Sequence, residues 1–294
     1  MDSNRKYLVA AVTAAHLALG GGRASAQSAQ PTAQQIVDRI KANIGIPWNP
    51  NTVDTFKAGD PNTPVTGIAT TMMATLDVLQ RAAASGHNLI ITHEPTFYSH
   101  EDATTALDDD RDPVYLAKQA FIREHRLVVW RFHDHWHQRH PDGIRAGVLR
   151  ALGWEPYVNA ANANVFDLPE MSLGALAATL KERLDTHAMR VIGDSAARIR
   201  RVGLSEGYGS PTNNRHLMQF TGVDALIIGE QREWETIEYA DDAIAVKQRK
   251  GLIVLGHIPS EQPGMEECAR WLKTFVKDIP VDFVATRESF WVPK

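Results

Sequence analysis

The amino-acid sequence predicts an α/β protein in which two α/β domains contain mixed, largely parallel sheets covered by helices. From residue 65 onward, short apolar stretches typical of buried strands alternate with longer amphipathic stretches typical of helices. Residues 153–169 contain several Asn and Pro and separate two runs of this alternation. The chain has 294 residues, 44% of them hydrophobic, which is enough for two cores of ordinary size. We therefore expect an N-terminal domain at residues 27–155 and a C-terminal domain at residues 156–294.

The first 26 residues are typical of a signal peptide. Arg5 and Lys6 precede an apolar run, and the small residues 24–26 suit cleavage by signal peptidase. The apolar run, residues 7–19, is too short to cross a bilayer comfortably, so we expect no stable membrane insertion after cleavage. An exported bacterial protein, periplasmic or secreted, is expected, with a mature chain that begins near Gln27. The sequence leaves the export route open, because Lys6 replaces the second arginine of a twin-arginine signal.

The predicted N-terminal domain opens with a helix. Thr32 suits its N-cap, Ile36 and Ile40 lie on one apolar face, and Gly45 suits its end. A loop rich in Pro, Asn and Gly follows. The alternation then predicts strands at residues 66–72, 89–92 and 127–132, with helices at 73–85 and 113–125.

The predicted C-terminal domain repeats this order. Helices are expected at residues 172–184 and 234–248, and strands at 201–206, 225–230 and 252–257. Strands that alternate with helices form parallel sheets, in which ligands bind beyond the carboxyl ends of the strands.

Histidine follows three of the predicted strands, at His93, His133 and His257. Seven of the 12 histidines lie between His93 and His140, a concentration that composition alone does not explain. His257 and Glu261, in "GHIPSE", would share one face of a helix that begins by Ile258.

The segment "HDHWH" at residues 133–137 has two interpretations. His133, His135 and His137 would share one face if the strand continued through them, whereas a turn would spread them apart. Any one of these residues has an ordinary alternative as a hydrogen-bonded structural histidine. Histidine with carboxylate at three strand ends together favours a metal site, and Zn, Mn and Fe accept such mixed nitrogen and oxygen ligands.

A serine hydrolase is an alternative. Ser205 lies in "GLSEG", which fits the G-x-S-x-G pattern, and Asp241 or Asp242 followed by His257 would keep the order of a catalytic triad. A nucleophile elbow leads directly into a helix, but "YGSPTNN" follows here and favours a loop. Ser205 is therefore not expected to be the nucleophile.

Four segments resemble a known family when they are taken in order. "LIITHEPTF", "FHDHWH", "GVDALIIGEQREWETIEYA" and "GLIVLGHIPSE" are similar to segments of the NGG-one interacting factor three (NIF3) family, also described as GTP cyclohydrolase I type 2-like. The resemblance covers most of residues 65–290. It implies a metal cleft between two α/β domains, a dinuclear metal centre, and a ring-shaped homo-oligomer, possibly a hexamer.

The resemblance assigns ligands residue by residue. His93, His257 and Glu261 match the family's motifs directly, whereas Glu94 stands where a His is expected and His137 where an Asp is expected. The exchange keeps three His and two carboxylates at these five positions. With His133 added, the predicted ligands of two divalent ions (Zn, Mn or Fe) are His93, Glu94, His133, His137, His257 and Glu261.

The predicted function is an exported, dinuclear-metal-dependent hydrolase that acts on an amide, cyclic amide or phosphoester bond of a small molecule. Glu94 or Glu101, where it is not a ligand, is the expected catalytic base. A non-catalytic metal-binding or metal-delivery protein is the alternative. Nucleic acid is not an expected partner, because the net charge is −4 and the basic residues are scattered.

Overall fold

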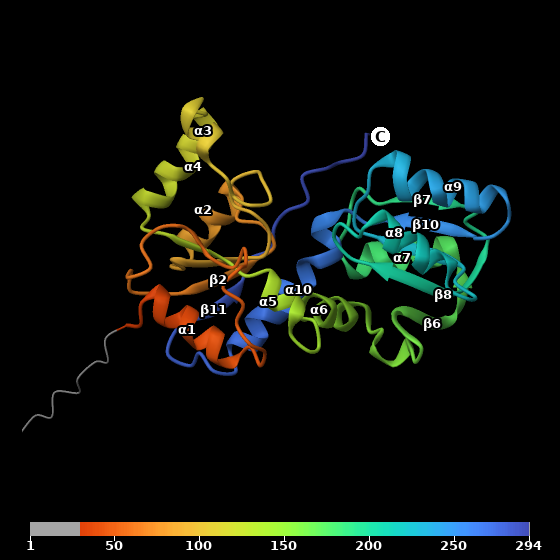
Figure 1. The fold of residues 1–294 in the computed structure, drawn as a ribbon, viewed down its shortest axis with the longest axis horizontal. Coiled ribbons are helices and arrows are strands. Elements are labelled where there is room, and N and C mark those ends of the chain that lie inside the picture. Colours follow the sequence, from red (N-terminus) through yellow and green to blue (C-terminus); the bar gives the residue numbers. More distant parts are fainter. Residues whose placement is uncertain (1–29, 294) are drawn as a thin grey trace, which may run out of the picture.

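The computed structural model of the protein describes residues 30–293. The predicted signal peptide, and with it the expectation of export, lies outside this range. Two sheets form the two halves of the molecule, and helices α6 (Gly143–Leu152) and α10 (His257–Leu272) run between them (Figure 1). No helix of residues 30–293 is both long and apolar enough to cross a membrane.

The first sheet has five strands in the order β1-β4-β3-β2-β11. Four of them are parallel, and β1 runs antiparallel to β4. The strands are β1 (Phe56–Ala58), β2 (Ile68–Thr71), β3 (Leu89–Thr92), β4 (Val128–Arg131) and β11 (Val281–Phe283). Every residue of β2, β3 and β4 is buried, as expected of parallel strands that are covered on both faces.

Helices cover both faces of this sheet. Helix α1 (Ala33–Asn43) packs its buried face, with Ile36 and Ile40, on the side of the sheet that carries Ile68. Helices α2 (Leu76–Ala84) and α4 (Pro113–Glu124) pack on the opposite side with Ile90. Short helix α3 (Thr105–Asp109) precedes α4.

The second sheet has six strands in the order β5-β6-β8-β9-β10-β7, of which β8, β9 and β10 are parallel and the others antiparallel. The strands are β5 (Val158–Asn159), β6 (Asn162–Ser172), β7 (Arg190–Gly193), β8 (Arg198–Ser205), β9 (Ala225–Ile228) and β10 (Gly251–Val254). The other helices of this half are η1 (Glu155–Tyr157), α7 (Leu173–Arg183), α8 (Pro211–Gln219), η2 (Glu233–Ile237) and α9 (Glu238–Ala245). Helix α7 covers one face of the sheet, and α8 and α9 cover the other.

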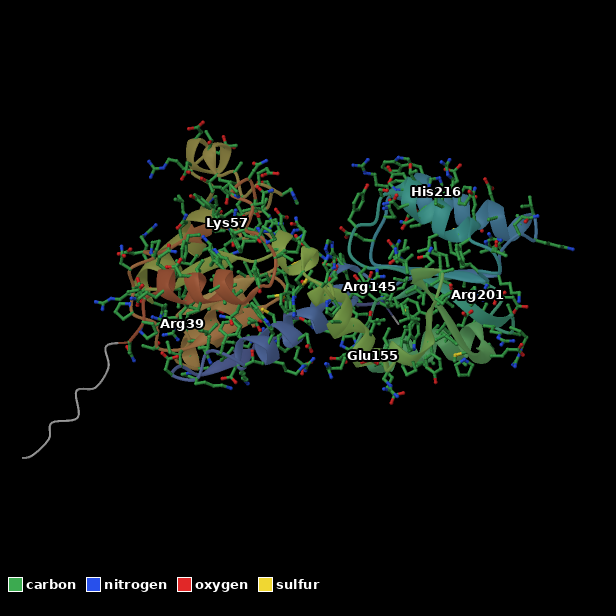
Figure 2. All side chains as sticks on the ribbon, turned by 60° about the horizontal axis from the view of Figure 1, so that its bottom comes forward. Arg39, Lys57, Arg145, Glu155, Arg201 and His216 are labelled. Carbon is green, nitrogen blue, oxygen red and sulfur yellow. The ribbon has the colours of Figure 1, made fainter. Side chains whose placement is uncertain are left out.

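Helices α6 and α10 cross at two glycines. A Cβ added at Gly147 would lie 2.3 Å from the backbone oxygen of Pro263, and one added at Gly264 would lie 2.4 Å from Cα of Ile144. The backbones therefore approach closely only because both positions lack a side chain. Arg145, at the junction of the two halves (Figure 2), donates from Nε to Glu206 at 3.1 Å and so ties α6 to the loop after β8.

The predicted fold class is confirmed, since both sheets are mixed and covered by helices. The division at residues 155 and 156 stays a prediction, but the two sheets do not follow it strictly. Strand β11, at residues 281–283, pairs with β2 and completes the first sheet. The last segment of the chain therefore returns to the N-terminal half.

Candidate metal centre

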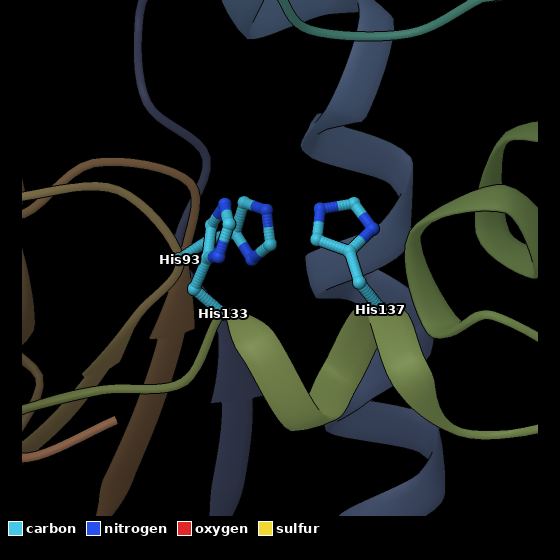
Figure 3. Close-up of side chains that lie close together, drawn as sticks. All are labelled: His93, His133 and His137. Carbon is cyan, nitrogen blue, oxygen red and sulfur yellow. The ribbon is translucent and has the colours of Figure 1, made fainter. Parts of the chain in front are cut away.

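The six predicted ligands come together where strands end. Figure 3 shows three of them, His93, His133 and His137. His93 and Glu94 follow β3, His257 and Glu261 lie in the first turns of α10 after β10, and the remaining two histidines belong to the segment after β4. The carboxyl ends of parallel strands from both sheets therefore face one another across the site. Ligands of such sheets generally bind beyond the carboxyl ends of the strands.

Short helix α5 (Asp134–Gln138) follows β4 and settles the geometry of "HDHWH". His133 is its N-cap and His137 lies four residues later, so both side chains lie on one face. Ring centroids of His133 and His137 are 4.9 Å apart, and the His93 ring lies 4.6 and 4.9 Å from them. One ligand atom from each of the three histidines lies within 4.8 Å of the others.

A second group of ligand atoms shares His93 with the first. His93, Glu94 and Glu261 also place one ligand atom each within 4.8 Å of one another. His257 Nε2 joins them, 3.2 Å from Glu261 Oε2 and 3.4 Å from Glu94 Oε1. We call the six residues His93, Glu94, His133, His137, His257 and Glu261 the ligand cluster.

The four histidines of the ligand cluster are oriented in the same way. In each ring Nδ1 lies within hydrogen-bond distance of an oxygen, which leaves Nε2 for the cluster. The oxygens are Phe132 O at 3.2 Å from His93, Asp134 Oδ1 at 2.9 Å from His133, Asp142 Oδ2 at 3.0 Å from His137 and Glu230 Oε1 at 3.0 Å from His257. These partners were not predicted from the sequence, although Asp134 and Asp142 lie in or beside the segment after β4, and Glu230 follows β9, the neighbour of β10 in the sheet.

The surroundings of the His93 ring fit a bound cation. Its ring is fully buried and Nδ1 donates to a carbonyl, so Nε2 carries a lone pair. That nitrogen has no hydrogen-bond partner and lies 3.6 Å from Glu261 Oε2. A divalent metal ion satisfies a buried imidazole nitrogen and the neighbouring carboxylates at the same time.

Charge inside the cluster is balanced between acids and imidazoles. Burial, followed by the neighbouring histidines, lowers the pKa of His93 well below its ordinary value, so His93 is neutral and able to ligate. Burial is the largest single influence on Glu94 and opposes its ionisation, but the hydrogen bond with His257 and the charges of His257, His133 and Arg131 together outweigh burial and lower the pKa of Glu94. Burial also opposes the charge of His257, yet hydrogen bonds to Glu230, Glu261 and Glu94 raise its pKa to about 12. Binding of a cation is therefore expected to displace a proton from His257.

His135 is not part of the ligand cluster. It is fully buried on the opposite side of α5, where Nδ1 lies 2.7 Å from Asp54 Oδ2 and Nε2 accepts from Asn49 N at 2.9 Å. Its ring stacks on Trp48 with centroids 3.6 Å apart. His135 is therefore the hydrogen-bonded structural histidine of this segment.

Glu101 is not brought to the ligand cluster either, so its predicted role as catalytic base has no support in the geometry. Its side chain is 73% exposed, and its nearest ion-pair partner is His100 at 3.8 Å. The loop turns outward here because Asp102 Oδ1 accepts from the backbone N–H groups of Thr96 and Phe97. Of the two predicted bases, only Glu94 lies in the cluster.

Ser205 ends β8 and lines a cavity of about 240 Å³ together with His137 and Glu261. A loop, residues 206–210, follows Ser205 as predicted, but α8 begins at Pro211, inside the segment "YGSPTNN" for which a loop was expected. No histidine of residues 30–293 is hydrogen-bonded to its side chain, as a serine nucleophile would require. The loop instead brings Gly207 against Glu261, where an added Cβ would lie 2.2 Å from Oε1.

A larger cavity of about 580 Å³ lies on the other side of the ligand cluster. Glu94 and His257 form part of its wall, so an occupant would reach the cluster directly. Glu94 is the only acidic residue of the cluster that lines this cavity. Both cavities therefore border the ligand cluster.

A family model and a curated relative both match most of this chain. A sequence model described as Duf34/NIF3 (NGG1p interacting factor 3) matches residues 25–289. The GTP cyclohydrolase 1 type 2 homolog of Clostridium acetobutylicum is 26% identical over 218 residues, which cover 70% of this chain and 76% of the relative.

Solved structures show the same fold. The Bacillus cereus protein related to NIF3 has a TM-score of 0.69 at 15% identity, over 90% of this chain and 100% of that one. A hypothetical protein of Staphylococcus aureus has a TM-score of 0.65 at 17% identity, again over 90% of this chain and 100% of the other. At these identities the likeness concerns the fold.

Proposed function

This chain belongs to the Duf34/NIF3 family, and from that membership and its ligand cluster we propose that it is a hydrolase dependent on two divalent metal ions. The proposed substrate is a small molecule with an amide, cyclic amide or phosphoester bond. Export after loss of the signal peptide and assembly into a homo-oligomer, a hexamer by resemblance, are parts of the same proposal.

The observation that carries the proposal is the pair of overlapping ligand groups that meet at His93. Three imidazoles on one side and two carboxylates on the other offer more donor atoms than one tetrahedral ion takes. Nε2 of His93 has no hydrogen-bond partner, and hydrogen bonds hold the rings of the other histidines in place. The ligand atoms are therefore oriented before an ion binds. Zn, Mn and Fe are the metals that such a donor set accepts.

Bound ions would supply Lewis-acid activation of a water molecule and of the substrate's carbonyl or phosphoryl oxygen. Glu94 lies both in the cluster and on the wall of the larger cavity, so we assign the acceptance of the water proton to whichever of its carboxylate oxygens does not hold an ion. Its Oε2 lies 3.5 Å from Nη2 of buried Arg131, which orients the carboxylate. His257 is held by Glu230 at the cavity wall and orients the reacting group from the other side.

Turnover of a substrate panel tests the proposal. Metal-loaded protein is given amides, cyclic amides and phosphoesters, and we expect at least one activity that a chelator abolishes and one added metal restores. Ser205→Ala is expected to keep most of that activity, and serine-directed inhibitors to have no effect. Turnover that survives complete removal of metal would contradict the proposal. Tight metal binding without any turnover would instead favour the metal-delivery alternative.

A further inference from the structure

The larger cavity contains a buried cation without a carboxylate partner. Lys118, on α4, is 4% exposed and lines this cavity. Its Nζ donates to the backbone oxygen of Thr96 at 2.6 Å, and within residues 30–293 no carboxylate oxygen lies within 4.0 Å of it. The ammonium group has three donors, and the one hydrogen bond that the described residues offer it goes to a neutral acceptor.

The acidic residue that acts on the charge of Lys118 is Asp102, and its carboxylate already contacts other residues. Asp102 lies 3.5 Å from Nζ of Lys57 and 3.9 Å from Nη1 of Arg131. Its other oxygen accepts two backbone N–H groups, as described above. Buried charges in proteins are normally paired, because an unpaired one has lost its hydration without compensation. Burial lowers the pKa of Lys118 to about 8, with Asp102 opposing the shift, so the charge is still largely present at neutral pH.

The rest of the cavity wall is suited to an apolar body. Six of its side chains are apolar or aromatic, namely Met73, Ala74, Leu76, Pro95, Tyr98 and Tyr208, and they share the wall with polar residues that include His100 and Glu230. The Tyr98 ring centroid lies 5.3 Å from Lys118 Nζ, so an aromatic surface borders the cation. A volume of about 580 Å³ is that of a site for a small molecule.

Tyr98 is held in a costly backbone conformation to reach this place. Its φ is +63°, in the left-handed region that aromatic residues rarely adopt. The turn is fixed by Asp102, which accepts from both Thr96 N and Phe97 N. Such strain, in a segment that forms the wall of a cavity, is typical of binding sites.

We propose that Lys118 is the anion-binding residue of this cavity, and that its ligand is a small amphipathic molecule with an apolar or aromatic body and one oxyanion group. The carboxylate or phosphate of the ligand accepts hydrogen bonds from Lys118 Nζ, while the opposite end of the molecule lies at Glu94 and His257. This inference deepens the proposed function and rests on it only in taking the Glu94 end as the reacting end.

Binding of matched probes tests the inference. The probes are phenylacetate, 4-phenylbutyrate and phenyl phosphate, with 2-phenylethanol and 4-phenylbutanol as neutral counterparts, titrated by calorimetry into metal-free and metal-loaded protein. In the metal-free protein no metal ion attracts the probe. There we expect the anionic probes to bind about tenfold more tightly than the alcohols. The tighter of phenylacetate and phenyl phosphate identifies the preferred oxyanion.

Variants assign the preference to one residue. Lys118→Met, which keeps an unbranched side chain as far as Cε but lacks the ammonium group, is expected to remove the preference for anions but not the binding of the alcohols. Lys118→Arg should keep part of it, and Lys181→Met, on an exposed face of α7, should behave as wild type. A crystal with 4-bromophenylacetate should place the carboxylate at Lys118 Nζ and the bromine, located by anomalous scattering, toward Glu94.

Two results would overturn the inference. One is equal binding of anions and alcohols by metal-free wild-type protein, and the other is an unchanged preference in a folded Lys118→Met variant. The crystal structure decides the matter if Lys118→Met does not fold, since a carboxylate bound away from Lys118 also contradicts it. Absence of hydrolysis with a Lys118-dependent preference intact would refute the proposed reaction and leave the anion site standing.

Discussion

Glu94 and His137 are the two residues at which this chain exchanges ligand types relative to the motifs it resembles. Both lie in the ligand cluster, one in each of the two ligand groups that share His93. A carboxylate bridges two cations more readily than an imidazole, which normally binds one, so the exchange moves the bridging capacity from position 137 to position 94. The neighbouring His135, by contrast, is bonded to Asp54 and faces away.

The exchange gives the first prediction. Glu94→Ala and His137→Ala should each lower the metal bound per folded chain, and Glu94→His combined with His137→Asp should restore it. His135→Ala is the control: it should keep its metal but lose about 3 kcal/mol of stability, because a fully buried ring and its hydrogen bond with Asp54 are removed. Elemental analysis and urea unfolding measure the two quantities. Full metal content in both single alanine variants would show that Glu94 and His137 are ordinary strand-end residues.

Lys118 gives a pH-dependent prediction. Its pKa falls from 10.5 to about 8 on folding, so between these values the unfolded chain binds more protons at this residue than the folded chain does. Stability of the wild type therefore rises with pH through this window. Lys118→Met lacks this rise, and its stability relative to wild type should fall by about 3 kcal/mol from neutral pH to the top of the window. Urea unfolding of both metal-free proteins across the window checks it, and a constant difference would contradict the shift.

Among the elements, α5 shows both what the sequence could predict and what it could not. The strands β3, β4 and β10 were predicted because continuous Ile, Leu and Val bounded by polar residues indicate buried parallel strands. The sequence left open whether His133, His135 and His137 share a face, because five polar and aromatic residues have no decisive periodicity. The structure resolves this with a single helical turn, which Asp54 fixes by accepting from the N–H groups of His133 and His135.

Helix α8 and strand β11 are among the elements that were not predicted from the sequence. Helix α8 begins at Pro211 within "YGSPTNN", where Ser210 caps it, although the composition favours a loop. Strand β11 is short, and only its pairing with β2 makes it a strand. Both are decided by tertiary contacts that local patterns do not contain.

The crossing of α6 and α10 gives a prediction at the level of elements. Gly147→Ala should lower the free energy of unfolding by about 1–3 kcal/mol, because the added Cβ meets the Pro263 backbone and the helices must separate. Since α10 carries His257 and Glu261, bound metal should also weaken. Gly174→Ala in α7, whose added Cβ would lie no closer than 3.2 Å to a neighbour, is the control and should change little. Equal stability of the two variants would show that the crossing tolerates a side chain.

At the scale of the whole molecule, the metal centre depends on how the two sheets are joined. The chain passes from the first sheet through α6 to the second and returns through α10 to β11 (Figure 1). This return places the start of α10 at the carboxyl ends of the second sheet and its end beside the first. Ligands from both halves therefore meet without a long flexible connection.

Export is a prediction for the whole chain. Protein recovered from its native host should have an intact mass that corresponds to a chain beginning close to Gln27, because small residues flank the expected cut. Mass spectrometry of the periplasmic or secreted fraction measures this. A full-length mass with Met1 retained, in a membrane fraction, would contradict it.

The number of metal ions per chain tests the central claim most directly. Purified protein, stripped and then loaded with Zn, Mn or Fe, is analysed for metal and for protein in the same sample. Two overlapping ligand groups predict two ions per chain in the wild type and a clear loss in His93→Ala, since His93 belongs to both groups. One ion or none per wild-type chain after loading, or an unchanged content in folded His93→Ala, would contradict the dinuclear centre.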